Sequence, residues 1–303
     1  MATTTTTQVT TPVIADANDT RLRGGRWWAK VGWKHVLAVV IIAYAVFPLL
    51  YVLSASLSPG GTLTGSATLF SEVSGANYAE LLETRFPTWM KNSLIVSSAA
   101  AVGTVVMGAA AAYAFSRFRF TGRRGGLTAL LIIQMFPQML AFVAIFLLLL
   151  TLGDVFPMLG IGQHLALIAV YLGGALGSNT FLMYGFFNTI PRELDEAAKI
   201  DGATHAQIFW GMVMRLVTPI LAVVGLLSFV STYGEFILAR IVLNRPETYT
   251  LAVGLYVWAS DERNAPWSLF AAGAVIAAIP IIALFMYLQK YIVAGLTAGS
   301  VKG

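Results

Sequence analysis

The stretch LTALLIIQMFPQMLAFVAIFLLLLTL, residues 127–152, contains no Asp, Glu, Lys or Arg over its whole length. A helix needs about 20 mainly apolar residues to cross the hydrocarbon core of a bilayer. The stretch therefore predicts a transmembrane helix. Pro137 lies near its middle and lacks a backbone N–H, so we expect a kink there.

Five further apolar stretches of similar length make the chain a polytopic membrane protein. Of its 303 residues, 57% are hydrophobic and 11% are charged, whereas soluble domains carry about 25% charged residues. We predict an all-α fold with six transmembrane helices. They cover roughly 35–57, 92–115, 127–152, 164–187, 216–239 and 268–291.

The distribution of Lys and Arg predicts the orientation of these helices. If the N-terminus is cytoplasmic, the inner segments hold 14 of the 19 basic residues and the outer segments hold 5. Cytoplasmic loops normally carry this excess, so both termini are expected in the cytoplasm. The net charge of +5 then faces anionic membrane lipid, and no nucleic-acid partner is expected. The chain has no Cys, which excludes disulfides and Cys-ligated metals.

The chain divides into four predicted regions. Residues 1–34 form a Thr-rich tail, expected to be disordered, and a basic juxtamembrane segment. A signal peptide is the alternative, but the apolar run 36–57 is longer than the usual core of about 7–15 residues. Residues 35–91 contain the first span and an outer loop, 92–292 a five-helix core, and 293–303 a cytoplasmic tail.

A polar loop, residues 188–215, lies between the fourth and fifth predicted spans, on the cytoplasmic side in this orientation. Thr189 is a plausible N-cap of a short helix that carries acids in its first turn. Asp201-Gly202 predicts a turn, after which Thr204 caps a second short helix. The residue pattern leaves open whether these helices dock on another protein or lie on lipid.

The sequence EAAKIDGA at 196–203, followed by Ile-Phe and by Pro219, resembles the EAA loop of importer-type ABC permeases. The resemblance implies a coupling helix that docks on a cytoplasmic ATPase. Met214-Arg215 stands where many family members have Leu-Pro, and its effect is left open. The implied coupling positions are Glu196, Ala197, Ala198, Asp201 and Gly202.

Three further stretches, 92–118, 247–258 and 295–303, resemble the smaller permease subunit of maltose/maltodextrin importers. The resemblance covers about residues 35–303. It implies a heterodimer with a second permease subunit, an ATPase dimer and an extracytoplasmic sugar-binding protein, in the cell membrane of a prokaryote. It also implies a tail contact with the ATPase for Ser300, Lys302 and Gly303.

ATP hydrolysis is not expected on this chain. A phosphate-binding loop of the G-x-x-x-x-G-K-[ST] type is absent, because no Lys follows Gly and precedes Ser or Thr. We therefore expect a non-catalytic permease subunit without a cofactor, with ATP and Mg²⁺ bound by the partner ATPase.

Polar side chains within the predicted spans are candidates for a translocation path. Buried polar residues in membranes are costly and are often functional, and amides and hydroxyls suit a neutral sugar. Hydrogen bonds between helices are the alternative for each residue. We expect Glu235 either to reach outward or to pair with a second permease subunit. The candidates are Gln134, Asn179, Thr180, Ser228, Ser231 and Glu235.

Trp258 and Trp267 flank the last predicted outer loop. They fit an aromatic belt at the membrane interface or a contact with the binding protein. The three His residues lie in separate segments, so no His-based metal site is expected.

The sequence favours an ATP-driven importer subunit for maltose or maltodextrin. A permease subunit for trehalose or another oligosaccharide is the closest alternative. A secondary transporter would need ion-coupling acids deep in the membrane, and Glu235 is the only acid within a predicted span. A membrane enzyme would need a nucleophile and a base at close spacing, and no such pattern is visible in the sequence.

Overall fold

The structure is a computed structural model that describes residues 28–59, 69–70, 72–260 and 265–300. Every regular element within these ranges is a helix, which confirms the all-α class. The chain forms two compact units, residues 1–51 and 52–303. The predicted Thr-rich tail lies outside the described residues.

The first unit contains η1 (Trp28–Gly32) and most of α2 (Trp33–Leu57). In the second unit, the C-terminal turn of α2 is tied to α3 (Ala76–Glu83). Asn77 donates its side-chain N–H to the Ser56 carbonyl at 2.8 Å, and the hydroxyls of Ser56 and Tyr78 lie 2.7 Å apart. Helix α3 lies in the segment that the sequence predicts to be an outer loop.

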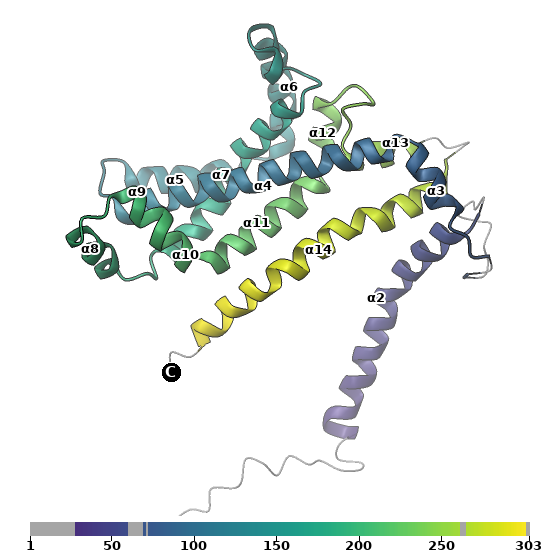
Figure 1. Cartoon of the computed structure of the whole chain (residues 1–303), viewed down its shortest axis with the longest axis horizontal. Helices are drawn as coiled ribbons and strands as arrows, with labels where there is room; N and C mark the ends of the chain where they lie inside the picture. Colours follow the sequence, from purple (N-terminus) through teal and green to yellow (C-terminus); the bar gives the residue numbers. More distant parts are fainter. Residues whose placement is uncertain (1–27, 60–68, 71, 261–264, 301–303) are drawn as a thin grey trace, which may run out of the picture. The chain divides into compact units, whose positions relative to one another are not determined.

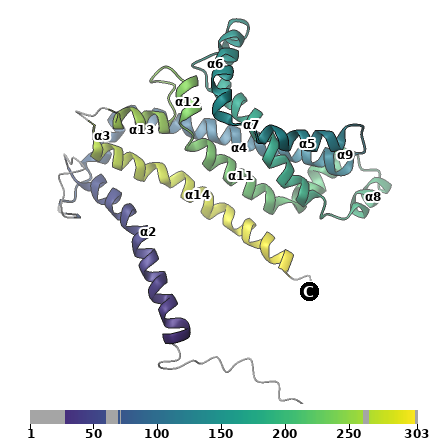
Figure 2. The same cartoon turned by 180° about the vertical axis from the view of Figure 1, so that it is seen from behind.

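Four helices form the packed body of the second unit. They are α4 (Phe86–Arg117), α7 (His164–Phe187), α11 (Thr218–Tyr233) and α14 (Trp267–Ser300). Helix α4 packs against α7 and α11, and α11 packs against α14. Figures 1 and 2 show α4, α11 and α14 running side by side.

Four helices of the described residues are long and apolar enough to cross a membrane, and two bent helix pairs raise the number to six if each pair is one span. The first pair is α5 (Arg123–Gln134) and α6 (Gln138–Val155), which meet at 101°. Pro137 stands between them in an extended conformation and directly precedes α6. The predicted kink is therefore a complete break, because Pro137 cannot continue the hydrogen bonding of α5.

The fifth predicted span, 216–239, is wrong in its last six residues, 234–239. Helix α11 ends at Tyr233, and Glu235 lies in a short linker before α12 (Ile237–Val242). A bend of 80° separates α11 from the second bent partner, which runs from His205 to Leu216. This partner consists of α9 (His205–Gln207), η3 (Ile208–Val213) and α10 (Met214–Leu216).

Two apolar clusters stabilise opposite ends of α4. The first includes Trp89 and Leu251, the first residue of α13 (Leu251–Ala259), and we call this the α13 end. The second includes Tyr113, Phe187 and Ala198, which lies on α8 (Arg192–Ile200), and we call this the α8 end. A helix of 32 residues is about 48 Å long, so α4 connects these two ends.

Candidate functional site

A cavity of about 490 Å³ lies between α5, α6, α7 and α11. Its wall is largely apolar but carries hydroxyl, amide and carboxylate groups, and we call it the polar cavity. Its size is that of a small-molecule site. Five of the six polar candidates from the spans line it, while Thr180 is fully buried elsewhere. The polar residues on its wall include Gln134, Tyr171, Asn179, Ser228, Ser231 and Glu235.

Glu235 points inward, so the expectation that it reaches outward is wrong. Its Oε2 accepts hydrogen bonds from the Tyr171 hydroxyl at 2.7 Å and from the Ala239 N–H at 2.9 Å. Its Oε1 accepts from the Leu238 N–H at 2.8 Å. The carboxylate thus satisfies the first N–H groups of α12, where an anion is favoured. Arg240 lies instead over the ring of Tyr249, 5.6 Å from its centroid.

Gln134 reaches the cavity because a glycine faces it. It is the last residue of α5, directly before the break at Pro137. A Cβ added to Gly177 on α7 would lie 2.0 Å from Nε2 of Gln134. Gly177 thus leaves room for a polar side chain, whereas Gly173, one turn earlier on α7, has open space beside it.

Sequence reasoning missed Tyr171 and Ser178, which also line the cavity. Both lie on α7 with Asn179, and the spacing between 171, 175 and 178 places one helix face on the cavity. That periodicity could have identified Tyr171 in advance. The wall therefore combines hydroxyls, amides and aromatic carbon, with a carboxylate whose oxygens already have donors.

The loop 188–215 forms two short helices, as the sequence predicts, although the first cap differs. Helix α8 starts at Arg192 after Pro191, and Thr189 bonds back to the Phe186 carbonyl at 2.8 Å instead of capping α8. Pro191 restricts the residue before it to extended conformations, which delays the helix. Thr204 caps α9 through a reciprocal capping box with Gln207.

The coupling positions form an exposed surface on α8 and the following turn. Glu196, Ala197, Asp201 and Gly202 are exposed, whereas Ala198 is buried against the α8-end cluster. Gly202 has a φ of +83°, which an L side chain rarely adopts. Ile200 on this helix is 86% exposed, an apolar side chain left open on a polar loop. Their contact with an ATPase stays a prediction.

The other implied contact residues lie apart from the cavity. Trp258 is half-buried, with its ring 5.0 Å from that of Trp89, and Trp267 is half-buried beside Phe270. Ser300 is the last residue of α14. Lys302 and Gly303 lie outside the described residues, as does part of the loop between the two tryptophans.

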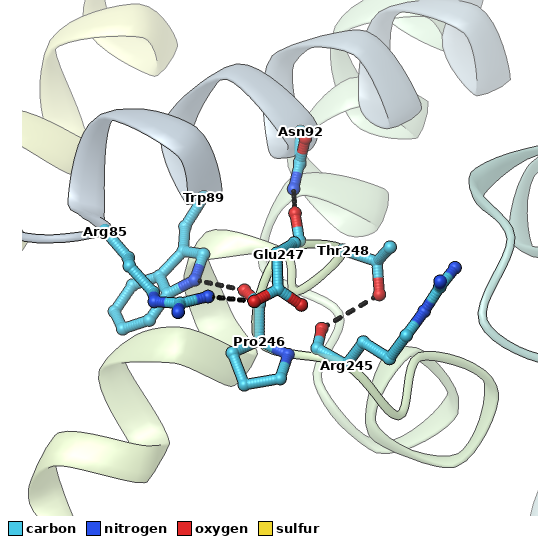
Figure 3. A network of polar contacts seen from close by, with 7 residues as sticks. All are labelled: Arg85, Trp89, Asn92, Arg245, Pro246, Glu247 and Thr248. Atoms are coloured by element: carbon cyan, nitrogen blue, oxygen red, sulfur yellow. Dashed lines mark hydrogen bonds and ion pairs between the residues drawn. The ribbon is translucent and has the colours of Figure 1, made fainter.

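A loop at the α13 end is fixed to the start of α4 by hydrogen bonds (Figure 3). Trp89 donates from Nε1 to the Pro246 carbonyl at 2.8 Å. Asn92 donates from Nδ2 to the Glu247 carbonyl at 2.9 Å. Arg85 forms an ion pair with the Glu247 carboxylate. The hydrogen bond from Arg85 lowers the pKa of Glu247 below that of an ordinary glutamate.

The histidines do not form a common site. His164 lies 2.7 Å from the Thr248 carbonyl, and His205 packs against the Phe118 ring. Within the described ranges, no group of three His, Cys, Asp or Glu residues is placed to hold a metal ion.

The fold and this site define a polytopic helical membrane protein with a polar cavity between its apolar helices. The model of the family "Binding-protein-dependent transport system inner membrane component" matches residues 104–298. The chain therefore belongs to this family, and it is a multi-pass inner-membrane protein of bacterial type.

Curated relatives agree over nearly the whole chain. It is 38% identical to the galactooligosaccharides transport system permease protein of Bacillus subtilis, covering 92% of this chain and 98% of that one. It is 41% identical to the maltodextrin transport system permease protein of the same species, covering 88% and 93%. It is 39% identical to the maltose/maltodextrin transport system permease protein of Escherichia coli K12, covering 91% and 97%.

A solved structure shares the fold. A chain of a bacterial ABC transporter that imports the acidic polysaccharide alginate superposes with a TM-score of 0.76 over 90% of this chain and 99% of that chain. The two sequences are 24% identical, so this likeness concerns the fold alone.

Proposed function

We propose that this chain is one of two transmembrane subunits of an ATP-driven oligosaccharide importer. The polar cavity between α5, α6, α7 and α11 carries the proposal, because a neutral sugar is bound by hydroxyl and amide groups beside aromatic carbon. Maltodextrin is the substrate class favoured by the resemblance and by two of the relatives. Trehalose or another oligosaccharide, such as the galactooligosaccharides of the first relative, remains the alternative.

The assembly contains a second permease subunit, an ATPase dimer and an extracytoplasmic sugar-binding protein. ATP and Mg²⁺ bind to the ATPase, and this chain needs no cofactor. The loop 188–215 lies in the cytoplasm and couples to the ATPase through the exposed surface of α8. The exposure of Glu196, Ala197, Asp201 and Gly202 supports this assignment, because these coupling positions are accessible to a partner. The tail residues Ser300, Lys302 and Gly303 reach the same partner.

A secondary transporter is less well supported. Acids within the membrane that exchange their partners are common in ion and proton pathways. Both oxygens of Glu235 are held by Tyr171 and by the first N–H groups of α12. Uptake that persists without an ATPase would favour that function.

Co-purification tests the assembly directly. The tagged chain is extracted gently from its native membrane, and its partners are identified by mass spectrometry. We expect an ATPase and a second permease, followed by binding-protein-dependent uptake of maltodextrin from a panel with trehalose and galactooligosaccharide. Recovery of the chain alone would contradict the proposal.

Substitution of Gly202 tests the coupling loop. Gly202→Val forces a β-branched residue into positive φ, which costs roughly 1–3 kcal/mol locally and distorts the turn after α8. We expect ATP-driven uptake to be lost while the protein remains in the membrane. Gly202→Asn is the matched control, because Asn tolerates this conformation. Normal uptake by the Val variant would disprove coupling through this turn.

A further inference from the structure

A buried ion pair connects α4 and α8. Nε of Arg117, the last residue of α4, lies 2.5 Å from Oδ2 of Asp195 in the first turn of α8. The two side chains are only 6% and 8% exposed. Neither Nε of Arg117 nor Oδ1 of Asp195 has a hydrogen-bond partner among the described residues, so the two groups meet as an ion pair, and Arg117 is the cation in direct contact with the buried carboxylate.

Two hydrogen bonds to backbone carbonyls flank the ion pair, one donated from α4 and the other donated from α8. Arg117 donates from Nη2 to the Ile190 carbonyl, just before α8, at 3.2 Å. Arg192, the first residue of α8, donates from Nη2 to the Ser116 carbonyl of α4 at 2.7 Å. Each helix therefore holds the backbone of the other through an arginine. Two such crossed contacts restrict both sliding and rotation of α8 along α4.

The rest of α8 is divided between a packed face and an open face. Ala198 lies in the α8-end cluster with Tyr113 and Phe187, which belong to α4 and α7. Leu194 and Ile200 are 41% and 86% exposed. A partner that binds the open face would thus press on a helix whose other face is fixed to α4.

We propose that Arg117 and Asp195 are positioning residues that make α8 and the end of α4 move as one body. The inference rests on the proposed function, in which α8 receives the movement of an ATPase. Helix α4 continues to the α13 end, where Trp89 and Asn92 hold the backbone of residues 246 and 247 (Figure 3). Displacement of α8 is then carried along α4 to the loop on the opposite side.

A buried ion pair between α4 and α8 suggests a role beyond stability, because apolar residues could stabilise the same contact. Replacing a buried ion pair by apolar residues of similar volume is often neutral or stabilising, whereas removing one partner is destabilising. Helix attachment through apolar contacts alone would tolerate such a replacement. An attachment that depends on the crossed arginine contacts would not tolerate this replacement, because the hydrogen bond from Arg117 to the Ile190 carbonyl would also be lost.

The first test, in the reconstituted complex, separates the role of the pair in attaching α8 to α4 from its role in coupling ATP hydrolysis to uptake. Asp195→Asn is compared with the double variant Arg117→Met, Asp195→Leu, with Glu193→Gln on the exposed side of α8 as the control. Assembly, thermal stability, ATP hydrolysis and maltodextrin uptake are measured. We expect uptake per ATP to fall roughly tenfold in Asp195→Asn, a typical size for a coupling between sites. The double variant should regain thermal stability without regaining uptake per ATP.

Two outcomes overturn the inference. Recovery of both stability and uptake in the double variant would reduce the pair to a structural contact. Equal uptake per ATP in Asp195→Asn and Glu193→Gln would remove the pair from coupling altogether.

The second test measures the rigidity directly and does not require the ATPase. Because the chain has no native Cys, spin labels can be placed at Glu193→Cys on α8 and Ala110→Cys on α4, both of which are exposed. We expect one narrow distance distribution in the chain alone, and the same distance in the complex with and without a non-hydrolysable ATP analogue. Adding Asp195→Asn should broaden the distribution.

A change of several ångströms between nucleotide states would disprove a rigid α4–α8 body, and so would an unchanged distribution in Asp195→Asn. If no ATPase co-purifies, the proposed function fails, while the label distances in the chain alone still decide whether the pair fixes α8 to α4.

Discussion

The α8 end and the α13 end each hold an ion pair, and the two pairs differ in their surroundings. Arg117 and Asp195 are 6% and 8% exposed, whereas Arg85 and Glu247 are 55% and 63% exposed. At the α8 end, charges excluded from water hold one helix to another. At the α13 end, the hydrogen bonds of Trp89 and Asn92 to backbone carbonyls hold the loop, and the ion pair lies at its surface. An arginine–carboxylate pair can therefore hold two helices together where it is buried and contribute little to stability where it is exposed.

The largest effect is expected for Asp195→Ala. It leaves the Arg117 guanidinium buried without its counter-charge, which should cost about 3–5 kcal/mol. Chemical unfolding in mild detergent, followed by the loss of helical signal, measures the difference. A loss below that of Asn92→Ala would show that the buried pair is not the main attachment of α8.

An intermediate effect is expected for Asn92→Ala at the α13 end. Asn92 is buried and donates to the carbonyls of Glu247 and Tyr249 at 2.9 and 3.0 Å. Leaving these acceptors without donors should cost about 1–3 kcal/mol. The exposed neighbour Lys91→Ala is the control, measured by the same unfolding experiment. Equal stability of the two variants would contradict the assigned role of Asn92.

A smaller effect on stability, with a clear effect on transport, is expected for Gly177→Ala in the cavity. The new Cβ would meet the Gln134 side chain, which is flexible and can swing away at a cost below about 1 kcal/mol. Gln134 would then leave the cavity wall, and the apparent affinity for maltodextrin in uptake assays should fall. Gly173→Ala, with open space beside it, is the control. Identical uptake by both variants would exclude Gln134 from the path.

The smallest effect on stability is expected for Arg85→Gln, because exposed ion pairs contribute little and are screened by salt. The variant should instead raise the pKa of Glu247 toward its ordinary value. In the parent chain the pKa of Glu247 is lowered. The stability that Glu247 contributes to the fold is therefore fully present above the ordinary pKa of a glutamate, and it is lost as the pH falls through the lowered pKa. Carboxyl NMR of labelled Glu measures the pKa. An unchanged pKa would show that Arg85 does not interact with Glu247 in the membrane.

Several parts of the fold and site were predictable from local patterns. Apolar runs gave the long helices, Pro137 gave the position of the break, and Thr204 gave the cap of α9. Each of these depends on residues within one or two helical turns. The end of the fifth span was not predictable in this way, because apolar residues continue past Gly234 into α12.

The amino-acid sequence by itself determined that the chain is helical, spans a membrane several times and carries a short helix-turn-helix loop between two spans. The family follows from the same residues. Only the tertiary structure decided that Glu235 faces inward, that Gly177 makes room for Gln134, and that Arg117 meets Asp195 across 78 positions of chain. Hydropathy and capping act locally and can be read along the chain. The partner of a buried charge depends on which helices pack together, and that is settled only when the whole bundle forms.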